Sequence, residues 1–343
     1  MISLKSVSLL KKILEGVWLL KHFRWNRKRV WIPLALLAIV YVNNSSLLTE
    51  APSGQPRLLA HRGVHQTFPF EGLQNDTCTA ERIHPPEHSY LENTIPSMKA
   101  AFEAGADLVE LDVQPTTDGT FAVFHDWVLE CRTNGKGVTR EHSMAELKKL
   151  DIGYGYTADG GKTFPFRGKG IGMMPSLDEV FREFPDQPLL IHVKSEDPAE
   201  GKMLAEFLSK LPESRLENLA VYGGDQPIEA LKREMPELRV MSKQTMKECL
   251  IPYIAIGWTG YVPDSCAHTQ LHLPEKIAPW LWGWPNRFLQ RMEERDTRVI
   301  LVAGGGGFSE GFDRVEDLER IPAEFSGWIW TNRIDRIGPE LKQ

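Results

Sequence analysis

The chain has 343 residues, enough for one large or two ordinary domains, and with 42% hydrophobic and 25% charged residues it has the composition of a folded globular protein. The formal net charge of −6 is unevenly distributed: residues 1–29 carry eight Lys/Arg and one Glu, and the remainder carries 32 basic and 45 acidic side chains. An acidic body argues against a nucleic-acid partner.

An uncharged segment follows the basic one. Residues 30–49 would form a helix of about 30 Å, just enough to cross a bilayer. The densely apolar part, residues 30–42, also fits the core of a cleaved signal peptide, although no A-x-A pattern follows. We expect a single-pass transmembrane anchor at the cell membrane, with residues 1–29 cytoplasmic, residues 50–56 as a linker and residues 57–343 in the periplasm or otherwise outside the cytoplasm. A cleaved, secreted form is the alternative.

From residue 57 onwards, short apolar runs alternate with helix-like segments. Strands are predicted over residues 57–61, 108–113, 121–125, 188–194, 218–223, 238–243, 298–302 and 327–332. Helices are predicted over residues 97–105, 143–150, 176–184, 201–211, 228–235, 287–295 and 315–321, with capping boxes that begin at Ser143 and Ser176. Eight strands that mostly alternate with helices predict an α/β fold, a (β/α)8 TIM barrel with parallel strands.

Two carboxylates lie on one face of a predicted strand. Side chains alternate along a strand, so Glu110 and Asp112 point the same way. On a half-exposed antiparallel sheet they would face solvent, whereas in a sheet buried on both faces they would need a cation. The barrel prediction favours the second arrangement. Other polar residues at the ends of predicted strands, where TIM barrels place catalytic groups, are His61, His125, His192 and Lys194.

Two imidazoles, an acidic pair and neighbouring cations suit phosphodiester cleavage. A divalent metal on the carboxylates would neutralise phosphoryl charge, while one imidazole takes a proton and the other protonates the leaving oxygen. Any single histidine of the ten in the chain is more often a core or loop residue. The shared position of His61 and His125 beside an acidic pair favours the catalytic interpretation.

A series of short motifs carries a family resemblance. They occur in the order HRG (61–63), ENT (92–94), VELDV (109–113), TDG (117–119), HD (125–126), RTNGKG (132–137), ELKKLDIG (146–153) and PSLDEV (175–180). In this order the sequence resembles the glycerophosphodiester phosphodiesterase family from about residue 58 to 335. The resemblance implies metal-dependent hydrolysis of a glycerophosphodiester to an alcohol and glycerol 3-phosphate. The alternatives are a lysophospholipase D or sphingomyelinase D-like enzyme acting on a lysolipid, and a non-catalytic phosphate- or lipid-binding barrel.

The resemblance also implies roles for the motif residues. His61 and His125 would be the general acid and base. Arg62 would bind the phosphate, because a guanidinium fork suits phosphate oxygens, and Lys194 would add a point charge on the same anion.

The metal would be held by Glu110 and Asp112, with Glu92 and Asn93 supporting the site or simply closing a loop. The family typically has a third acidic ligand where this chain has His192. Losing that charge weakens a site for Mg²⁺ or Ca²⁺, the ions that the resemblance implies, and favours Zn²⁺ or Mn²⁺. His192 is either a metal ligand or a residue that only neighbours the ligands, and the sequence leaves both open.

Four further features stand out beside these motifs. The segment between Gly63 and Glu92 is much longer than a usual βα loop, so we expect it over the mouth of the site. In an exported protein the cysteines are disulfide candidates, and their positions favour the pairs Cys78–Cys131, at the rim of the site, and Cys249–Cys266. Three tryptophans in residues 279–288 either pack at a barrel end or form an apolar wall or a surface near a bilayer. Asn332 departs from the family, which usually has Asp there.

Overall fold

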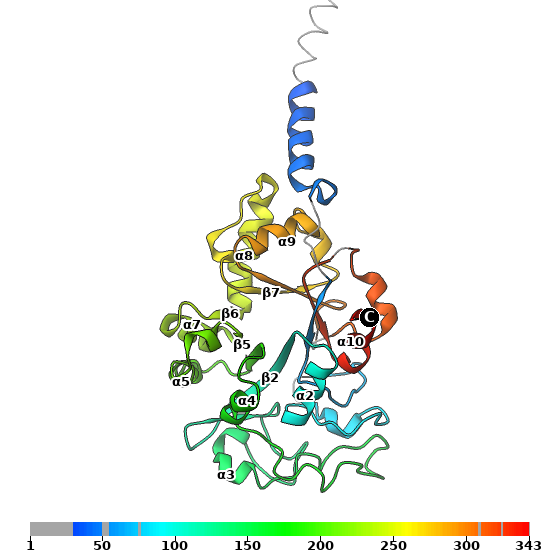
Figure 1. Cartoon of the computed structure of the whole chain (residues 1–343), viewed down its shortest axis with the longest axis vertical. Helices are drawn as coiled ribbons and strands as arrows, with labels where there is room; N and C mark the ends of the chain where they lie inside the picture. Colours follow the sequence, from blue (N-terminus) through cyan, green and yellow to red (C-terminus); the bar gives the residue numbers. More distant parts are fainter. Residues whose placement is uncertain (1–29, 50–54, 75–76, 308–309, 324, 343) are drawn as a thin grey trace, which may run out of the picture.

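The architecture is a barrel of parallel strands surrounded by helices, with one more helix standing off the barrel. The computed structural model describes residues 30–49, 55–74, 77–307, 310–323 and 325–342. Eight strands follow one another in the order β6-β5-β4-β2-β1-β9-β8-β7, with parallel pairings (Figure 1). A parallel bridge between Val240 and Thr269 brings the two ends of this sheet together. The predicted TIM-barrel class is confirmed.

The elements have the following bounds. The barrel strands are β1 (Arg57–Ala60), β2 (Leu108–Pro115), β4 (Leu189–Val193), β5 (Leu219–Gly223), β6 (Arg239–Ser242), β7 (Gln270–Pro274), β8 (Arg298–Val302) and β9 (Trp328–Thr331). The helices are α2 (Ile95–Glu103), α3 (Met144–Leu147), α4 (Leu177–Glu183), α5 (Pro198–Leu208), α6 (Glu213–Leu216), α7 (Asp225–Glu234), α8 (Lys243–Ile256), α9 (Asn286–Glu293) and α10 (Ile334–Leu341). Short 3₁₀ turns are η1 (Ser46–Leu48), η2 (Thr79–Arg82), η3 (Thr139–Glu141), η4 (Gly257–Thr259), η5 (Asp264–Cys266), η6 (Ala278–Trp280) and η7 (Val315–Arg320). The two predicted capping boxes are present at α3 and α4.

One predicted barrel strand is wrong and one barrel strand was missed. Residues 121–125 were expected in the barrel, but β3 (Phe121–Val123) pairs antiparallel with β2 and lies off the ring. The five residues between β2 and β3 are enough for a hairpin but not for the crossover that parallel pairing requires. The missing strand is β7, whose sequence QLHLP mixes polar residues and a proline with its leucines. Because one strand was wrongly included and one was missed, the predicted number of barrel strands, eight, is still correct.

The strand alternation divides the core into an outer and an inner layer. Outward side chains such as Val109 and Leu111 pack in the large apolar cluster beneath the helices. The inward Leu108 belongs to a smaller cluster with residues of β1, β4, β5, β8 and β9. The next inward positions along β2 are Glu110 and Asp112, both fully buried. The interior therefore changes from apolar to charged toward the carboxyl ends of the strands.

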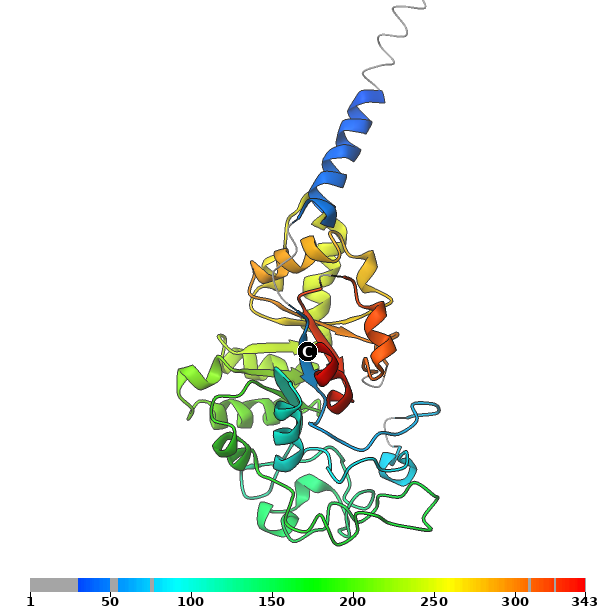
Figure 2. The same cartoon turned by 45° about the vertical axis from the view of Figure 1, so that its right-hand side comes forward.

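The long segment after β1 is packed against the loops that follow β3. Residues of 78–91 and 124–174 share a second apolar cluster, and both views show these segments side by side at one end of the molecule (Figures 1 and 2). The predicted disulfide Cys78–Cys131 joins them, with a Cα–Cα distance of 5.5 Å. The second predicted disulfide, Cys249–Cys266, links α8 to η5, with a Cα–Cα distance of 4.6 Å.

The N-terminal helix differs from the expected membrane span. Its described part covers residues 30–44 and is followed by η1, so the expected twenty-residue helix over 30–49 is not formed. Within the described residues, no helix combines the length and apolar character needed to traverse a bilayer. The basic segment 1–29 and most of the expected linker, residues 50–54, lie outside the described residues.

Candidate active site

The turn after β1 places His61 and Arg62 at the carboxyl end of the barrel. Arg62 has a left-handed backbone (φ 55°), which is uncommon for a residue with a side chain and concentrates at functional sites. At the next residue a Cβ would lie 2.3 Å from the Ser97 hydroxyl, so only Gly63 fits. The turn points the Arg62 backbone N–H at Glu110 Oε2, which accepts a hydrogen bond at 3.1 Å.

The acidic pair has several donors around it. Tyr222 Oη donates to Glu110 Oε1 at 2.8 Å, and Asn93 Nδ2 donates to Asp112 Oδ2 at 3.0 Å. The Arg62 guanidinium forms an ion pair with Asp112, with Nε 3.0 Å from Oδ2. Both carboxylates are buried, and Asp112 is paired with a guanidinium.

The pKa values of the two carboxyl groups are pushed apart. Burial, together with the charge of Asp112, raises the pKa of Glu110 to about 8. Burial also acts to raise the pKa of Asp112, but Arg62, His125 and a hydrogen bond from His192 outweigh it and hold this pKa well below its usual range. At Glu110, burial and the charge of Asp112 therefore outweigh the opposing effect of the Arg62 guanidinium.

His192 faces the interior of the barrel. β2 and β4 run parallel with Asp112 and His192 in register, so their side chains lie next to each other. His192 Nδ1 lies 2.9 Å from Asp112 Oδ1 and 3.8 Å from Glu110 Oε1, and the ring stacks on Tyr222 at 4.1 Å between centroids. One potential ligand atom from each of Glu110, Asp112 and His192 lies within 4.8 Å of the other two, a spacing at which the three could hold a divalent ion. The donor set therefore suits a metal.

His125 lies at the end of β3 and is held from both sides. Its Nδ1 is 2.6 Å from Asp126 Oδ1, and its Nε2 is 2.5 Å from Lys194 Nζ, which also donates to the His125 carbonyl oxygen at 3.2 Å. An ammonium only donates, so Nε2 is the unprotonated nitrogen and Nδ1 carries the proton. Burial and the nearby Arg62 lower the pKa of His125 to about 4.

His61 is oriented by an amide instead of a carboxylate. Asn332 Nδ2 donates to Asp313 Oδ2 at 3.0 Å, so the amide oxygen faces His61 and accepts from its Nδ1 at 2.6 Å. His61 Nε2 then points toward the acidic pair, 3.8 Å from Glu110 Oε2. Burial and Arg62 lower the pKa of His61.

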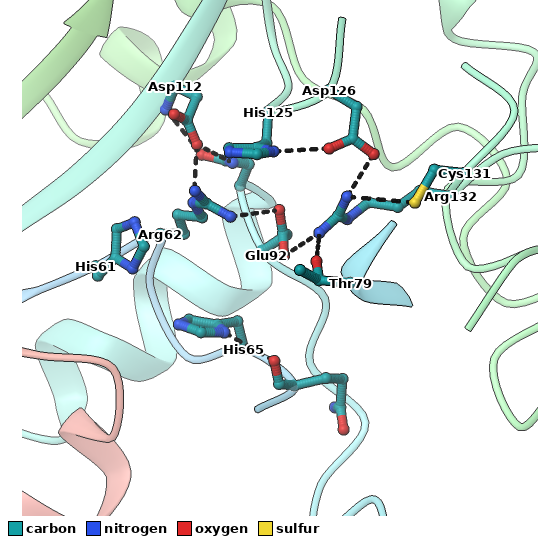
Figure 3. A network of polar contacts seen from close by, with 12 residues as sticks. His61, Arg62, His65, Thr79, Glu92, Asp112, His125, Asp126, Cys131 and Arg132 are labelled. Carbon is teal, nitrogen blue, oxygen red and sulfur yellow. Dashed lines mark hydrogen bonds and ion pairs between the residues drawn. The ribbon is translucent and has the colours of Figure 1, made fainter. Parts of the chain in front are cut away.

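A chain of charged groups connects the two sides of the site. Glu92 pairs with Arg62 at 3.3 Å and with Arg132 at 3.2 Å, and Arg132 continues to Asp126 (Figure 3). Arg132 also donates to Thr79 of the long segment at 2.6 Å, next to the Cys78–Cys131 disulfide. Glu92 therefore does more than close a loop: it links the phosphate-binding candidate to the support of His125.

The residues that the sequence analysis selected lie together in the structure, but several of their contact partners were not predicted. No role was assigned to Asp126 or Arg132, although both lie within quoted motifs. Also missed were the aromatic residues beside the acidic pair and the imidazoles, Tyr222, His272 and Trp330, whose ring centroids lie 5.1–6.3 Å from one another. The pattern that could have identified them is a polar or aromatic residue at an inward-facing position of a barrel strand.

Comparisons with known proteins agree with this site. Residues 61–225 match the sequence model of the glycerophosphoryl diester phosphodiesterase family. A glycerophosphodiester phosphodiesterase of Caldanaerobacter subterraneus is 42% identical over 103 residues, 30% of this chain and 39% of the relative. One from Bacillus subtilis is 35% identical over 129 residues, 36% of this chain and 42% of the relative. The chain is thus similar to the glycerophosphoryl diester phosphodiesterase family over a little under half of its length, and it spans less than half of the length of these two relatives.

Solved structures share the fold at low sequence identity. The glycerophosphoryl diester phosphodiesterase domain of a Mycobacterium tuberculosis protein superposes with a TM-score of 0.58 at 17% identity, covering 82% of this chain and 97% of that domain. A phosphodiesterase of Oleispira antarctica, solved in complex with the product sn-glycerol-3-phosphate, gives a TM-score of 0.52 at 18% identity, covering 84% and 98%. These likenesses concern the barrel architecture.

Proposed function

We propose that this protein hydrolyses glycerophosphodiesters to an alcohol and glycerol 3-phosphate. The observation that carries the proposal is the pair of imidazoles, each held through Nδ1: Nε2 of His61 lies 3.8 Å from Glu110 of the buried acidic pair, and Nε2 of His125 lies 2.5 Å from the Lys194 ammonium. The names of the two bacterial relatives and the product in the Oleispira structure support the same substrate class.

In this proposal Arg62 and Lys194 bind the phosphodiester. Glu92 and Asp112 engage two edges of the Arg62 guanidinium, which fixes its plane before a substrate arrives. Lys194 places an ammonium within 2.5 Å of His125 Nε2, so an anion bound there lies beside the imidazole that reacts with it. Two fixed cations favour the added charge of the transition state.

His61 and His125 move the protons. One Nε2 removes the proton of the attacking oxygen as a new P–O bond forms, and the other donates a proton to the alcohol oxygen as the old P–O bond breaks. One Nε2 must start unprotonated and the other protonated. The Nδ1 partners of the two rings differ accordingly, since His61 faces the Asn332 amide and His125 faces the Asp126 carboxylate.

We also propose that Glu110, Asp112 and His192 hold a divalent ion. Such an ion would neutralise charge on a phosphoryl oxygen and would offset the repulsion that raises the pKa of Glu110. Two carboxylates with one imidazole are compatible with Zn²⁺ or Mn²⁺, and the family resemblance favours Mg²⁺ or Ca²⁺.

The direct test is a release assay over a panel of glycerophosphodiesters and lysolipids. The full chain, freed of metal by a chelator, is assayed alone and after addition of Mg²⁺, Ca²⁺, Mn²⁺ or Zn²⁺. We expect glycerol 3-phosphate to form from glycerophosphodiesters only after metal is restored. Activity unaffected by chelation would remove the metal from the proposal, and release of a phosphorylated alcohol would contradict the assigned bond cleavage.

Lysolipid hydrolysis is the second candidate. A human lysophospholipase D is 29% identical over 243 residues, 69% of this chain and 70% of that protein. Tyr222 and His272, which are partly exposed and pack on each other beside the acidic cluster, offer an aromatic surface for a larger alcohol or an acyl chain. However, neither the cavity of about 290 Å³ beside Trp328 nor the cavity of about 540 Å³ beside Trp258 is lined by any of the tryptophans at 280, 282 and 284. The same panel separates the candidates by the ratio of kcat/KM for the two substrate classes.

We further propose that the barrel works outside the cytoplasm. The support is that the four cysteines form two disulfides, which persist in oxidising compartments. Thiol labelling of protein isolated from cells under alkylating conditions should find all four cysteines protected. Four labelled thiols would contradict this location.

A further inference from the structure

The N-terminal helix has an apolar surface that no other part of the described chain covers. Residues 30–39 are all exposed, and among them Trp31, Leu37 and Ile39 are about 64–65% exposed. Ten consecutive exposed residues span nearly three turns, so the exposed apolar side chains surround the helix instead of forming one stripe. Both views show this helix projecting from the barrel (Figures 1 and 2).

The base of this helix is fixed to one side of the barrel. Asn43 and Asn44 donate to the carbonyl oxygen of Trp258 at 3.1 and 2.8 Å, and Arg291 of α9 donates to the Asn43 carbonyl at 3.0 Å. Ser46 Oγ donates to the carbonyl oxygen of Gly283 at 2.9 Å. These bonds set the direction in which the helix leaves the barrel.

The barrel surface around this base is also apolar and rich in aromatic residues. On α8, Ile251 and Ile254 are 62% and 52% exposed, and in the loops that follow α8 and β7 the side chains of Trp258 and Trp280 are 41% and 84% exposed. Trp282 Nε1 donates to the Ile254 carbonyl at 2.9 Å, so the tryptophan loop and α8 belong to one continuous patch. We call this patch, made of Ile251, Ile254, Trp258, Trp280 and Trp282, the tryptophan collar.

We propose that helix 30–44 and the tryptophan collar together dock the enzyme on a lipid bilayer, with the helix inserted and the collar at the level of the headgroups. A second copy of the chain would cover one stripe of the helix, whereas lipid covers a helix that is apolar on every side. Trp side chains favour the membrane–water interface, which is where a collar around the base of an inserted helix would lie.

Length and charge agree with this arrangement. The described helix of 15 residues is about 22 Å long, which allows insertion into a bilayer without requiring that this segment cross it. The sequence directly before it, residues 1–29, carries eight Lys/Arg and one Glu, a charge complementary to anionic headgroups. The inference does not depend on which phosphodiester the site hydrolyses.

The test measures partitioning of the full chain onto vesicles of phosphatidylcholine mixed with phosphatidylglycerol, by flotation over a range of lipid concentrations. One variant alters the helix (Leu34→Glu with Leu37→Glu), and a second alters the collar (Ile254→Ser with Trp280→Ser). The matched control is Ile171→Ser with Val315→Ser, which removes exposed apolar side chains, 63% and 42% exposed, from outside the collar. Hydrolysis of a water-soluble glycerophosphodiester checks that each variant is folded.

We expect the helix variant to lose flotation and the collar variant to partition about tenfold more weakly, while the control matches the unaltered chain. Equal partitioning of the collar variant and the control would overturn the role of the collar. An unaltered chain that stays with the vesicle-free fraction, and instead forms dimers disrupted by the helix variant, would overturn the proposal in favour of self-association.

Discussion

The two imidazoles of the site are supported in different ways. His125 Nδ1 faces the Asp126 carboxylate, which belongs to a charged chain running through Arg132 and Glu92. His61 Nδ1 faces the neutral amide of Asn332, which is itself held by Asp313. A carboxylate stabilises an imidazolium by charge, whereas an amide fixes mainly the orientation and tautomer. We infer that His125 is better suited to carry a proton during turnover and that His61 depends more on geometry.

Removing either ring should have the largest effect. His61→Ala and His125→Ala should each lower kcat by about 10²-fold or more, since each removes a group that we propose transfers a proton. Steady-state release of glycerol 3-phosphate measures this, and circular dichroism checks the fold. A folded variant that keeps full activity would exclude its histidine from the mechanism.

Removing the charge behind His125 should have the next largest effect. Asp126→Asn replaces a charge-assisted hydrogen bond and should lower kcat about 10- to 100-fold. The pH profile gives a second readout. Burial and Arg62 lower the pKa of His125 from the ordinary value of 6.5 to about 4, so a neutral base persists until the pH falls to that value. Because Asp126 acts to raise this pKa, the acidic limb should move to lower pH in the variant. A shift of the acidic limb to higher pH would contradict the assigned contact between Asp126 and His125.

Removing the amide behind His61 should cost less. Asn332→Ala deletes a neutral hydrogen bond and should lower kcat about fivefold with little change in KM. Asp313→Ala should act in the same direction, because it releases the same amide, and the double variant should be little worse than Asn332→Ala. Additive effects of the two substitutions would show that they do not act through one chain of contacts.

Changing the third residue of the acidic cluster should alter selectivity more than rate. His192→Glu adds a negative charge beside Glu110 and Asp112 and should shift metal preference toward Mg²⁺ or Ca²⁺, measured as activity after metal restoration. If His192 only neighbours the ligands, the change should crowd the site and lower activity with every metal.

The two disulfides should differ in their link to the site, and here we expect the smallest effect on activity. Replacing Cys78 and Cys131 by serine opens a loop of 53 residues and should cost about 2–4 kcal/mol of stability, with a modest loss of activity because Arg132 contacts Thr79 beside it. Replacing Cys249 and Cys266 should lower stability while leaving kcat unchanged. Thermal unfolding and kinetics on both variants make the comparison, and equal kinetic effects would contradict it.

The sequence predicted what depends on local patterns. Alternation along β2 placed Glu110 and Asp112 on one buried face, and the spacing of cap residues located α3 and α4. Which strands belong to the barrel was harder to predict. The strand β3 has the apolar composition of a barrel strand but pairs with β2 as a hairpin, and β7 has too few apolar residues to be recognised as a strand.

The support of His61 was not predictable in the same way. Its contact with Asn332 joins residues 271 positions apart, and it depends on β1 and β9 being neighbours in the closed barrel. Asn332 was noticed only as a departure from the family. Lys194, by contrast, was expected to bind the phosphate, which stays a prediction, and its contact with His125 was not foreseen.

The most direct test of the account is the product of glycerophosphocholine turnover, identified by phosphorus NMR for the metal-restored full chain and for His61→Ala and His125→Ala. We predict glycerol 3-phosphate as the phosphorus product of the unaltered chain and at least about 10²-fold slower formation in either variant. Choline phosphate as the product, or equal rates in all three proteins, would contradict the assignment of this site.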